Sequence, residues 1–95
     1  MVRRVLKYDW DPGKNAENIR VHGVSFLEAE TTMNNRLSRS VPDLEHPSIE
    51  DRWRTIGWSD LDRLLVVIAS DGEPRPRIIS ARRATKRERN AYERR

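Results

Sequence analysis

Leu64-Leu65-Val66-Val67-Ile68-Ala69 is the longest apolar run in the chain. A short continuous apolar run between polar turns is typical of a strand buried on both faces of a sheet. Strands are expected on either side of it, because Arg52 to Trp58 alternates and Arg77 to Ala81 is rich in β-branched residues. The turns at 59–62 and 71–74 are short, so the three strands are predicted to form an antiparallel meander.

Two helices are predicted before the meander. Asp11-Pro12 supplies a capping aspartate and a first-turn proline, and the helix is expected to reach about His22, with Gly23 as its C-terminal cap. Ser25 and Glu28 form a capping box for a second helix, which carries Phe26, Ala29 and Met33 on one face and ends at Asn34-Asn35.

The remaining segments complete the expected fold. Arg4 to Tyr8 is predicted to be an N-terminal strand, and residues 36–49 a loop with one short strand near Ser40-Val41. A second capping box, Thr85 to Glu88, is expected to open a terminal helix that reaches about Arg94. These elements predict an α+β fold: a small antiparallel sheet with an N-terminal strand, two helices, a β-meander and a C-terminal helix, with the helices on one side.

Length and composition limit the functional classes. The chain has 95 residues, which suits a single domain over residues 1–95, and no cysteine. It shows neither a signal-peptide core nor an apolar run long enough to span a membrane, so a cytoplasmic protein without membrane contact is expected. Two histidines and no cysteine argue against a zinc site, and no metal or other cofactor is predicted. The net charge of +4 favours an anionic partner, either nucleic acid or an acidic protein.

The two histidines are candidates for proton transfer. His22 shares a helical face with Lys14 and Asn18, and such a face could bind a phosphate and move a proton. His46 precedes a strand, with Glu50 nearby as a base or an orienting group. Both histidines also have structural interpretations: His22 as a helix-end residue that the C-terminal dipole favours, and His46 as a packed loop residue.

Arginines on or beside adjacent strands are candidates for phosphate binding. They are Arg52, Arg54, Arg77, Arg82 and Arg83. Guanidinium groups stay charged and could stabilise the charge that grows on phosphorane oxygens. Simple alternation puts Ser80 and Arg82 on one face of the last strand and Arg77 on the other, so the arginines converge only if the sheet edge bends. The alternative is a solvated sheet face.

Aromatic residues could stack on nucleobases or fill the core. They are Tyr8, Trp10, Trp53, Trp58 and Tyr92. In so small a domain, the core is the more common place for them.

Three segments in register resemble the BrnT family of toxins. The first reads Trp10-Asp11-Pro12-Gly13-Lys14-Asn15, then Asn18, then His22-Gly23-Val24-Ser25-Phe26. The middle segment has His46, Glu50, Arg52 and Gly57 at the family's spacing. The last reads Arg77-Ile78-Ile79-Ser80-Ala81-Arg82, followed by Ala84-Thr85, Glu88-Arg89 and Tyr92-Glu93. The match covers nearly the whole chain.

This resemblance implies a fold similar to RelE-type ribonucleases and a metal-independent endoribonuclease toxin of a type II toxin–antitoxin system. It further implies an RNA substrate and a BrnA-like ribbon-helix-helix antitoxin, which forms a hetero-oligomer with the toxin and alone contacts DNA. The expected catalytic residues are Arg52, Arg77, Arg82, His22, His46, Glu50 and Ser80. Lys14, Arg54 and Arg83 are expected to bind RNA.

The chain departs from the family pattern at several places. Met33-Asn34 stands where phenylalanine-aspartate is usual, and residues 35–45 match poorly. Val21 stands where a lysine is usual, and Pro47 where a serine is usual. These departures motivate an alternative function, a non-catalytic basic module that binds RNA or an antitoxin.

Overall fold

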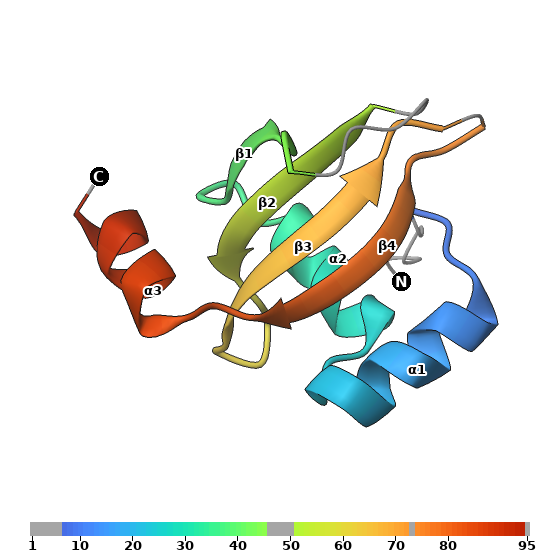
Figure 1. Cartoon of the computed structure of the whole chain (residues 1–95), viewed down its shortest axis with the longest axis horizontal. Helices are drawn as coiled ribbons and strands as arrows, with labels where there is room; N and C mark the ends of the chain where they lie inside the picture. Colours follow the sequence, from blue (N-terminus) through green and yellow to red (C-terminus); the bar gives the residue numbers. More distant parts are fainter. Residues whose placement is uncertain (1–6, 46–50, 73, 95) are drawn as a thin grey trace, which may run out of the picture.

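The fold combines a four-stranded antiparallel sheet with three helices in the residues that the computed structural model describes, namely 7–45, 51–72 and 74–94. Helices α1 (Pro12–His22) and α2 (Phe26–Met33) precede the sheet, and α3 (Lys86–Glu93) follows it. The strands are β1 (Arg39–Pro42), β2 (Arg52–Trp58), β3 (Leu64–Ser70) and β4 (Arg77–Arg83). Their spatial order follows the sequence (Figure 1), which confirms the α+β class and the meander.

The expected N-terminal strand is not formed in the part that can be described. Residues 4–6 lie outside the described residues, and Lys7 and Tyr8 are not in a strand. A single parallel bridge joins Asp9 to Arg77. The backbone N–H of Lys7 donates to the Glu30 carboxylate (2.9 Å), so a side chain takes the place of a strand partner.

The core lies between β3, β4 and the first two helices. It contains Val24, Phe26, Ala29, Leu65, Val67, Ile78 and Ala81, all fully buried. Trp10 packs edge-on against Phe26 with ring centroids 6.2 Å apart, so Trp10 has a core role. Since β3 alternates between the two faces, Leu65 and Val67 point to this core while Val66 and Ile68 point to the opposite, open face.

Buried Asn18 fastens α1 to the edge of the sheet. Its side-chain amide donates to the carbonyls of Val24 (2.8 Å) and Ala81 (2.7 Å), and its oxygen accepts from the backbone N–H of Ala81 (3.2 Å). The helix ends one turn later, where Gly23 adopts the left-handed conformation (φ 67°) that favours glycine. These contacts place His22, the last residue of α1, beside β4.

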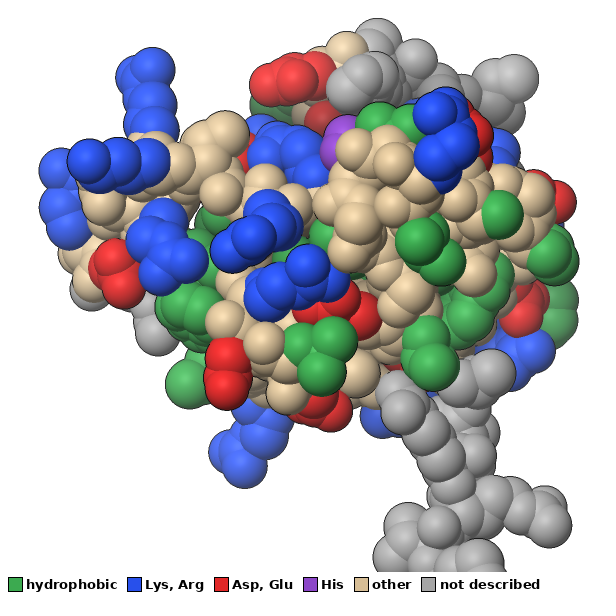
Figure 2. Space-filling view, turned by 90° about the horizontal axis from the view of Figure 1, so that it is seen from below, with side chains coloured by type: hydrophobic (Ala, Val, Ile, Leu, Met, Phe, Trp, Pro, Cys, Tyr) green, Lys and Arg blue, Asp and Glu red, His purple; other side chains and the backbone are tan. Residues whose placement is uncertain are grey.

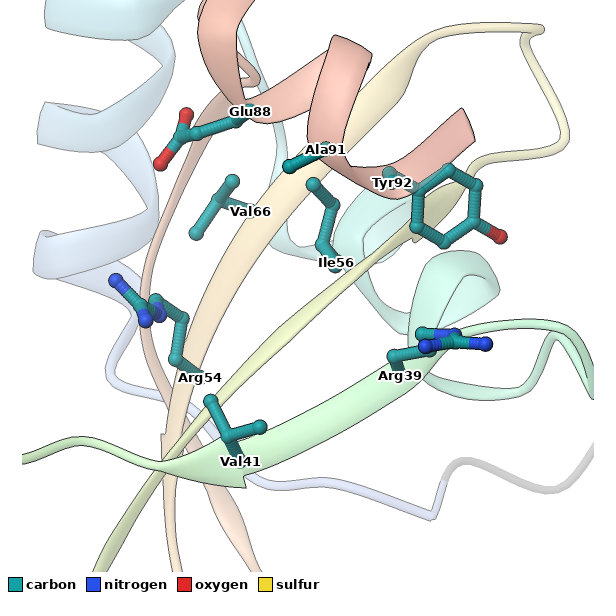
Figure 3. A pocket seen from close by; sticks show the side chains of 8 residues that line it. All are labelled: Arg39, Val41, Arg54, Ile56, Val66, Glu88, Ala91 and Tyr92. Carbon is teal, nitrogen blue, oxygen red and sulfur yellow. The ribbon is translucent and has the colours of Figure 1, made fainter. Parts of the chain in front are cut away.

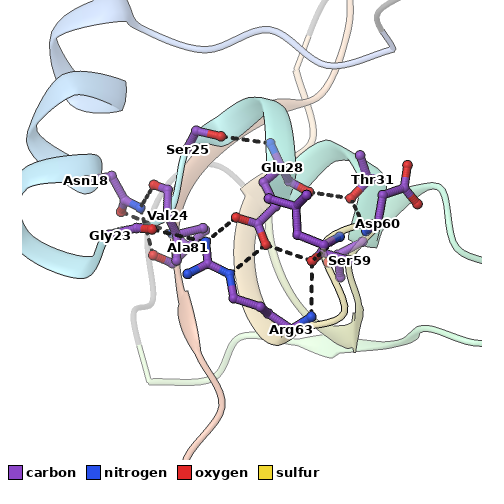
Figure 4. Close-up of polar contacts among 12 residues, drawn as sticks. Asn18, Gly23, Val24, Ser25, Glu28, Thr31, Ser59, Asp60, Arg63 and Ala81 are labelled. Carbon is purple, nitrogen blue, oxygen red and sulfur yellow. Dashed lines mark hydrogen bonds and ion pairs between the residues drawn. The ribbon is translucent and has the colours of Figure 1, made fainter.

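A buried ion pair fastens α2 to the β2–β3 turn. Glu28, buried on α2, accepts hydrogen bonds from the Arg63 guanidinium and from the Ser59 hydroxyl (2.7 Å), as Figure 4 shows. Arg63 holds the pKa of Glu28 below its usual range. Arg63 also donates to the Gly23 carbonyl (3.0 Å), so one side chain joins the turn to both N-terminal helices.

Helix α3 lies on the other side of the sheet from α1 and α2. Its side chains Ala91 and Tyr92 face Ile56 of β2 and Val66 of β3 (Figure 3), which belong to the open face. The expectation that all helices share one side is therefore wrong. The physical reason is that the open face also carries apolar residues, and these need partial cover from water.

Candidate active site

A cleft of about 390 Å³ opens where β4 meets the end of α1, α3 and the open face of the sheet. It is lined by His22, Asp43, Glu45, Arg54, Val66, Ile68, Ser80, Ala81, Arg82 and Glu88. Four of the residues selected from the sequence meet there: His22, Arg54, Ser80 and Arg82. Two arginines, an imidazole and a hydroxyl can together bind a phosphate and exchange protons with its substituents.

Strand register explains this convergence. Ile68 pairs with both Arg54 and Ser80, and Val66 pairs with Arg82. Directly paired residues lie on the same face of a sheet. Alternation along each strand therefore brings polar side chains from β2 and β4 onto one surface, on either side of the apolar β3.

A β-bulge changes the expected position of Arg77. The register between β3 and β4 shifts at Ile68/Ala69, and Arg77 pairs with Ser70, which in turn pairs with Arg52. The extra residue in β4 reverses the alternation, because a bulge sets two residues opposite one. Arg52 and Arg77 thus lie in one cross-strand row, although neither lines the cleft. Alternation without a bulge, which separated Arg77 from Ser80, gives the wrong face.

Arg52 has an unsatisfied group. Its Nε is buried and finds no hydrogen-bond partner among the described residues. Buried donors in folded proteins nearly always have partners, so this Nε is a candidate donor to a ligand or to solvent.

Arg82 forms the strongest ion pair of the cleft. Its Nη1 and Nη2 donate to the two carboxylate oxygens of Glu88 at 2.8 and 2.9 Å. This contact is the main reason why the pKa of Glu88 falls to about 2, and the pKa of Arg82 is raised in turn. Glu88 also accepts from the backbone N–H of Thr85 in a capping box. Arg82 therefore holds the first turn of α3 as well as lining the cleft.

The cleft also contains acidic groups that the sequence analysis did not select. Glu45 lies 4.0 Å from Arg54, and both side chains are well exposed, so this pair is weak. Asp43 and Glu88 line the cleft as well. The sequence did indicate one feature of Glu88, because it is the capping-box residue of the terminal helix, six positions after Arg82.

The other selected residues lie elsewhere. Lys14 is exposed in the first turn of α1 and lines none of the described cavities. Arg83 pairs with Leu65, so it belongs to the core-facing side, and its charge contributes to the lowered pKa of Glu28. His46 and Glu50 lie outside the described residues, and their roles remain predictions.

The part of the chain that the structure describes contains neither a metal-binding cluster nor a membrane-spanning helix. The described residues contain no group of three His, Cys, Asp or Glu side chains arranged to hold a metal ion. No described helix is long and apolar enough to cross a membrane.

The fold and the cleft define the class of the protein: it is a small basic α+β protein. Its open sheet face carries arginines in successive cross-strand rows, an arrangement suited to an anionic ligand. The family model described as the ribonuclease toxin, BrnT, of type II toxin–antitoxin systems matches residues 10–88. The chain therefore belongs to the BrnT ribonuclease toxin family.

A solved structure supports the same assignment. The crystal structure of the Brucella abortus ribonuclease toxin, BrnT, superposes with a TM-score of 0.63 and 26% sequence identity, over 86% of this chain and 100% of that one. No curated protein matches the chain.

Proposed function

We propose that the chain is a metal-independent endoribonuclease toxin whose cleft holds the scissile phosphate of an RNA strand. The observation that carries this proposal is the meeting of His22, Arg54, Ser80 and Arg82 in one cleft of a chain from a ribonuclease toxin family. Arg54, whose pair with Glu45 is weak, supplies positive charge where the phosphorane oxygens gain negative charge, and Arg82, held by Glu88, lies beside it.

The proposed reaction needs no group from outside the chain. The ribose 2′-oxygen attacks the adjacent phosphorus, the bond from phosphorus to the 5′-oxygen breaks, and a 2′,3′-cyclic phosphate and a 5′-hydroxyl result. One proton leaves the 2′-hydroxyl and one reaches the 5′-oxygen. His22 is the described cleft residue whose imidazole can both donate and accept a proton, and Ser80 offers a donor to a phosphate oxygen.

Arg52 and Arg77 extend the site along the strand. Their cross-strand row follows that of Arg54 and Ser80, and the buried Nε of Arg52 has no partner among the described residues. We assign this row to the neighbouring phosphate.

The antitoxin is proposed to be a BrnA-like ribbon-helix-helix protein that neutralises the toxin in a hetero-oligomer and contacts DNA itself.

His22→Ala and Arg54→Ala test the cleavage proposal better than a change at Arg82, since Arg82 also holds α3. Each variant is expected to lower RNA cleavage at least a hundredfold, the usual range for loss of a proton donor or a charge donor. Arg20→Ala, which removes an exposed arginine paired with Glu17, is the matched control. Growth after induction and cleavage of purified RNA in EDTA are measured together.

The chemistry has its own readout. Products should end in a 2′,3′-cyclic phosphate, and a single 2′-deoxyribose at the cleaved position should block the reaction. Full cleavage by both variants would place the site outside this cleft. RNA binding without cleavage by the parent chain would favour the non-catalytic binding module.

A further inference from the structure

A second cavity lies next to the cleft and has a different character. It is a groove of about 280 Å³ between α3 and the open face of the sheet. Its lining comes from β1, β2, β3 and α3: Arg39, Val41, Arg54, Ile56, Val66, Glu88, Ala91 and Tyr92. Figure 3 shows these side chains around a common space, with α3 on one side and β1 on the other.

The groove has an apolar floor and charged ends. Ile56 lies between the ring of Tyr92 and the side chain of Val41, and Val66 lies beside it near Glu88 (Figure 3). Arg39 and Arg54 stand at opposite ends with their guanidinium groups pointing apart, and the Glu88 carboxylate lines the groove as well. The Tyr92 hydroxyl donates to the Leu37 carbonyl (2.9 Å), which fixes the position of the ring. Apolar walls with an aromatic ring and arginine planes are the surroundings that unstacked nucleobases occupy in protein complexes.

The groove and the cleft are continuous. Both are lined by Arg54, Val66 and Glu88. A nucleotide whose phosphate lies at Arg54 in the cleft would therefore have its base within reach of the groove. At about 280 Å³ the groove lies just below the range of drug-sized ligand sites, roughly 300–1,000 Å³, and this size suits one planar ring system.

We propose that this groove is a nucleobase-binding subsite for a residue of single-stranded RNA next to the cleaved bond. The proposal rests on the proposed RNA cleavage and adds to it the element that can discriminate between bases. The base lies on the partly exposed Ile56 and meets the small exposed parts of Val66 (2%) and Tyr92 (6%), and Arg39 and Arg54 stack on it or bind its phosphate. RNA is favoured over an apolar protein segment because two arginines flank the groove, the carboxylate that lines it, Glu88, is paired with Arg82, and the cleft continues from it.

Ala91→Leu tests the subsite directly. Ala91 is exposed on α3 and lines the groove, so leucine fills the space without removing a hydrogen bond, and leucine is a good helix former. Asn90→Leu is the matched control, because it adds the same side chain to the same helix at an exposed position outside the groove. Thermal unfolding verifies that both variants fold.

The probe is a six-nucleotide 2′-O-methyl RNA, which cannot be cleaved, beside a strand of equal length made of abasic residues. Fluorescence anisotropy should show that the parent chain binds the base-containing strand about tenfold more tightly, in the range of one stacked base. Ala91→Leu should remove this difference and leave the abasic strand unaffected, and Asn90→Leu should change neither.

The outcomes separate this proposal from the cleavage proposal. Equal binding of the two strands by the parent overturns the base subsite but leaves phosphate binding intact. Binding of neither strand overturns both. If Ala91→Leu binds RNA like the parent but loses its affinity for a purified antitoxin, the groove is a protein-docking site and the base subsite is wrong. A 4-thiouridine placed in the strand should, in the unaltered chain, crosslink to the groove-lining residues of β1, β2, β3 or α3. Crosslinks confined to α1 or α2 contradict the proposal.

Discussion

At the scale of single residues, buried polar side chains fall into two groups: those that hold the elements together and those with a donor left for a ligand. Asn18 and Glu28 are buried and fully engaged in holding helices to the sheet and its turn. Arg52 is the opposite case, with a buried donor that no described residue satisfies. Buried groups with partners are structural, whereas a buried group without one is a candidate for ligand binding. The sequence does not show this difference, because helical spacing places Asn18 on the same face as Lys14 and His22.

Asn18→Ala should destabilise the protein by about 2–3 kcal/mol. The change leaves the backbone N–H and carbonyl of Ala81 without their partner in a buried place, and unsatisfied buried groups cost about 1–3 kcal/mol each. Urea unfolding at neutral pH measures the effect, with the exposed Asn90→Ala as control. A change below about 0.5 kcal/mol would show that α1 does not depend on this contact.

At the scale of elements, α3 is the part whose position depends most on a few contacts. Glu88 and Arg82 hold its first turn, Tyr92 bonds to the Leu37 carbonyl, and Arg89 lies 5.0 Å above the Trp58 ring. Its outer surface carries lysine and arginine, and Figure 2 shows these basic side chains gathered at that end of the molecule. The same helix forms a wall of the groove, so its docking and the proposed base subsite are linked.

The Glu88 pair should make the docking of α3 sensitive to acid. The pKa of Glu88 is lowered from 4.5 to about 2, so the pair stabilises the folded state fully above about pH 4.5 and is lost as the pH falls through about 2. Both side chains are partly exposed, so we expect about 1 kcal/mol at neutral pH after screening.

Glu88→Gln is the matched variant for this effect, because glutamine keeps the capping box but not the charge. Between pH 4.5 and pH 2 the parent should lose roughly 1 kcal/mol of stability that the variant has already lost. Thermal unfolding of both proteins across this range gives the comparison. Parallel curves for the two proteins would mean that the pair does not stabilise the fold.

The sequence predicted the regular elements well and the site less well. Helix α1 and strand β2 have the expected bounds, since capping residues and alternation are local signals. The face of Arg77 depends on a bulge, and the side taken by α3 depends on where uncovered apolar residues remain after the sheet has formed. Both are properties of the assembled sheet. The convergence of Arg54, Ser80 and Arg82 was partly predictable, because it follows from register.

At the scale of the whole molecule, the basic charge becomes specific only where the fold concentrates it. The chain carries a net charge of +4, yet several arginines are paired with carboxylates: Arg20 and Arg63 outside the cleft, and Arg82 within it. Two of the cross-strand rows of the open face carry Arg52, Arg54 and Arg77, and the next row carries Arg82. RNA affinity should therefore depend on these four positions and on Arg39 beside the groove, and not on total charge.

Salt dependence measures how many phosphates these positions contact. Each phosphate neutralised on a single strand adds about −0.7 to the slope of log affinity against log salt concentration, so four contacts predict a slope of about −3. Arg54→Ala should reduce its magnitude by about 0.7, whereas Arg20→Ala should leave it unchanged, because Arg20 lies on α1 outside the cleft. Anisotropy titrations of an uncleavable 2′-O-methyl RNA over a range of salt concentrations give the slopes. If both variants reduce the slope equally, RNA is bound by diffuse surface charge, and the proposal that the cleft binds phosphate is wrong.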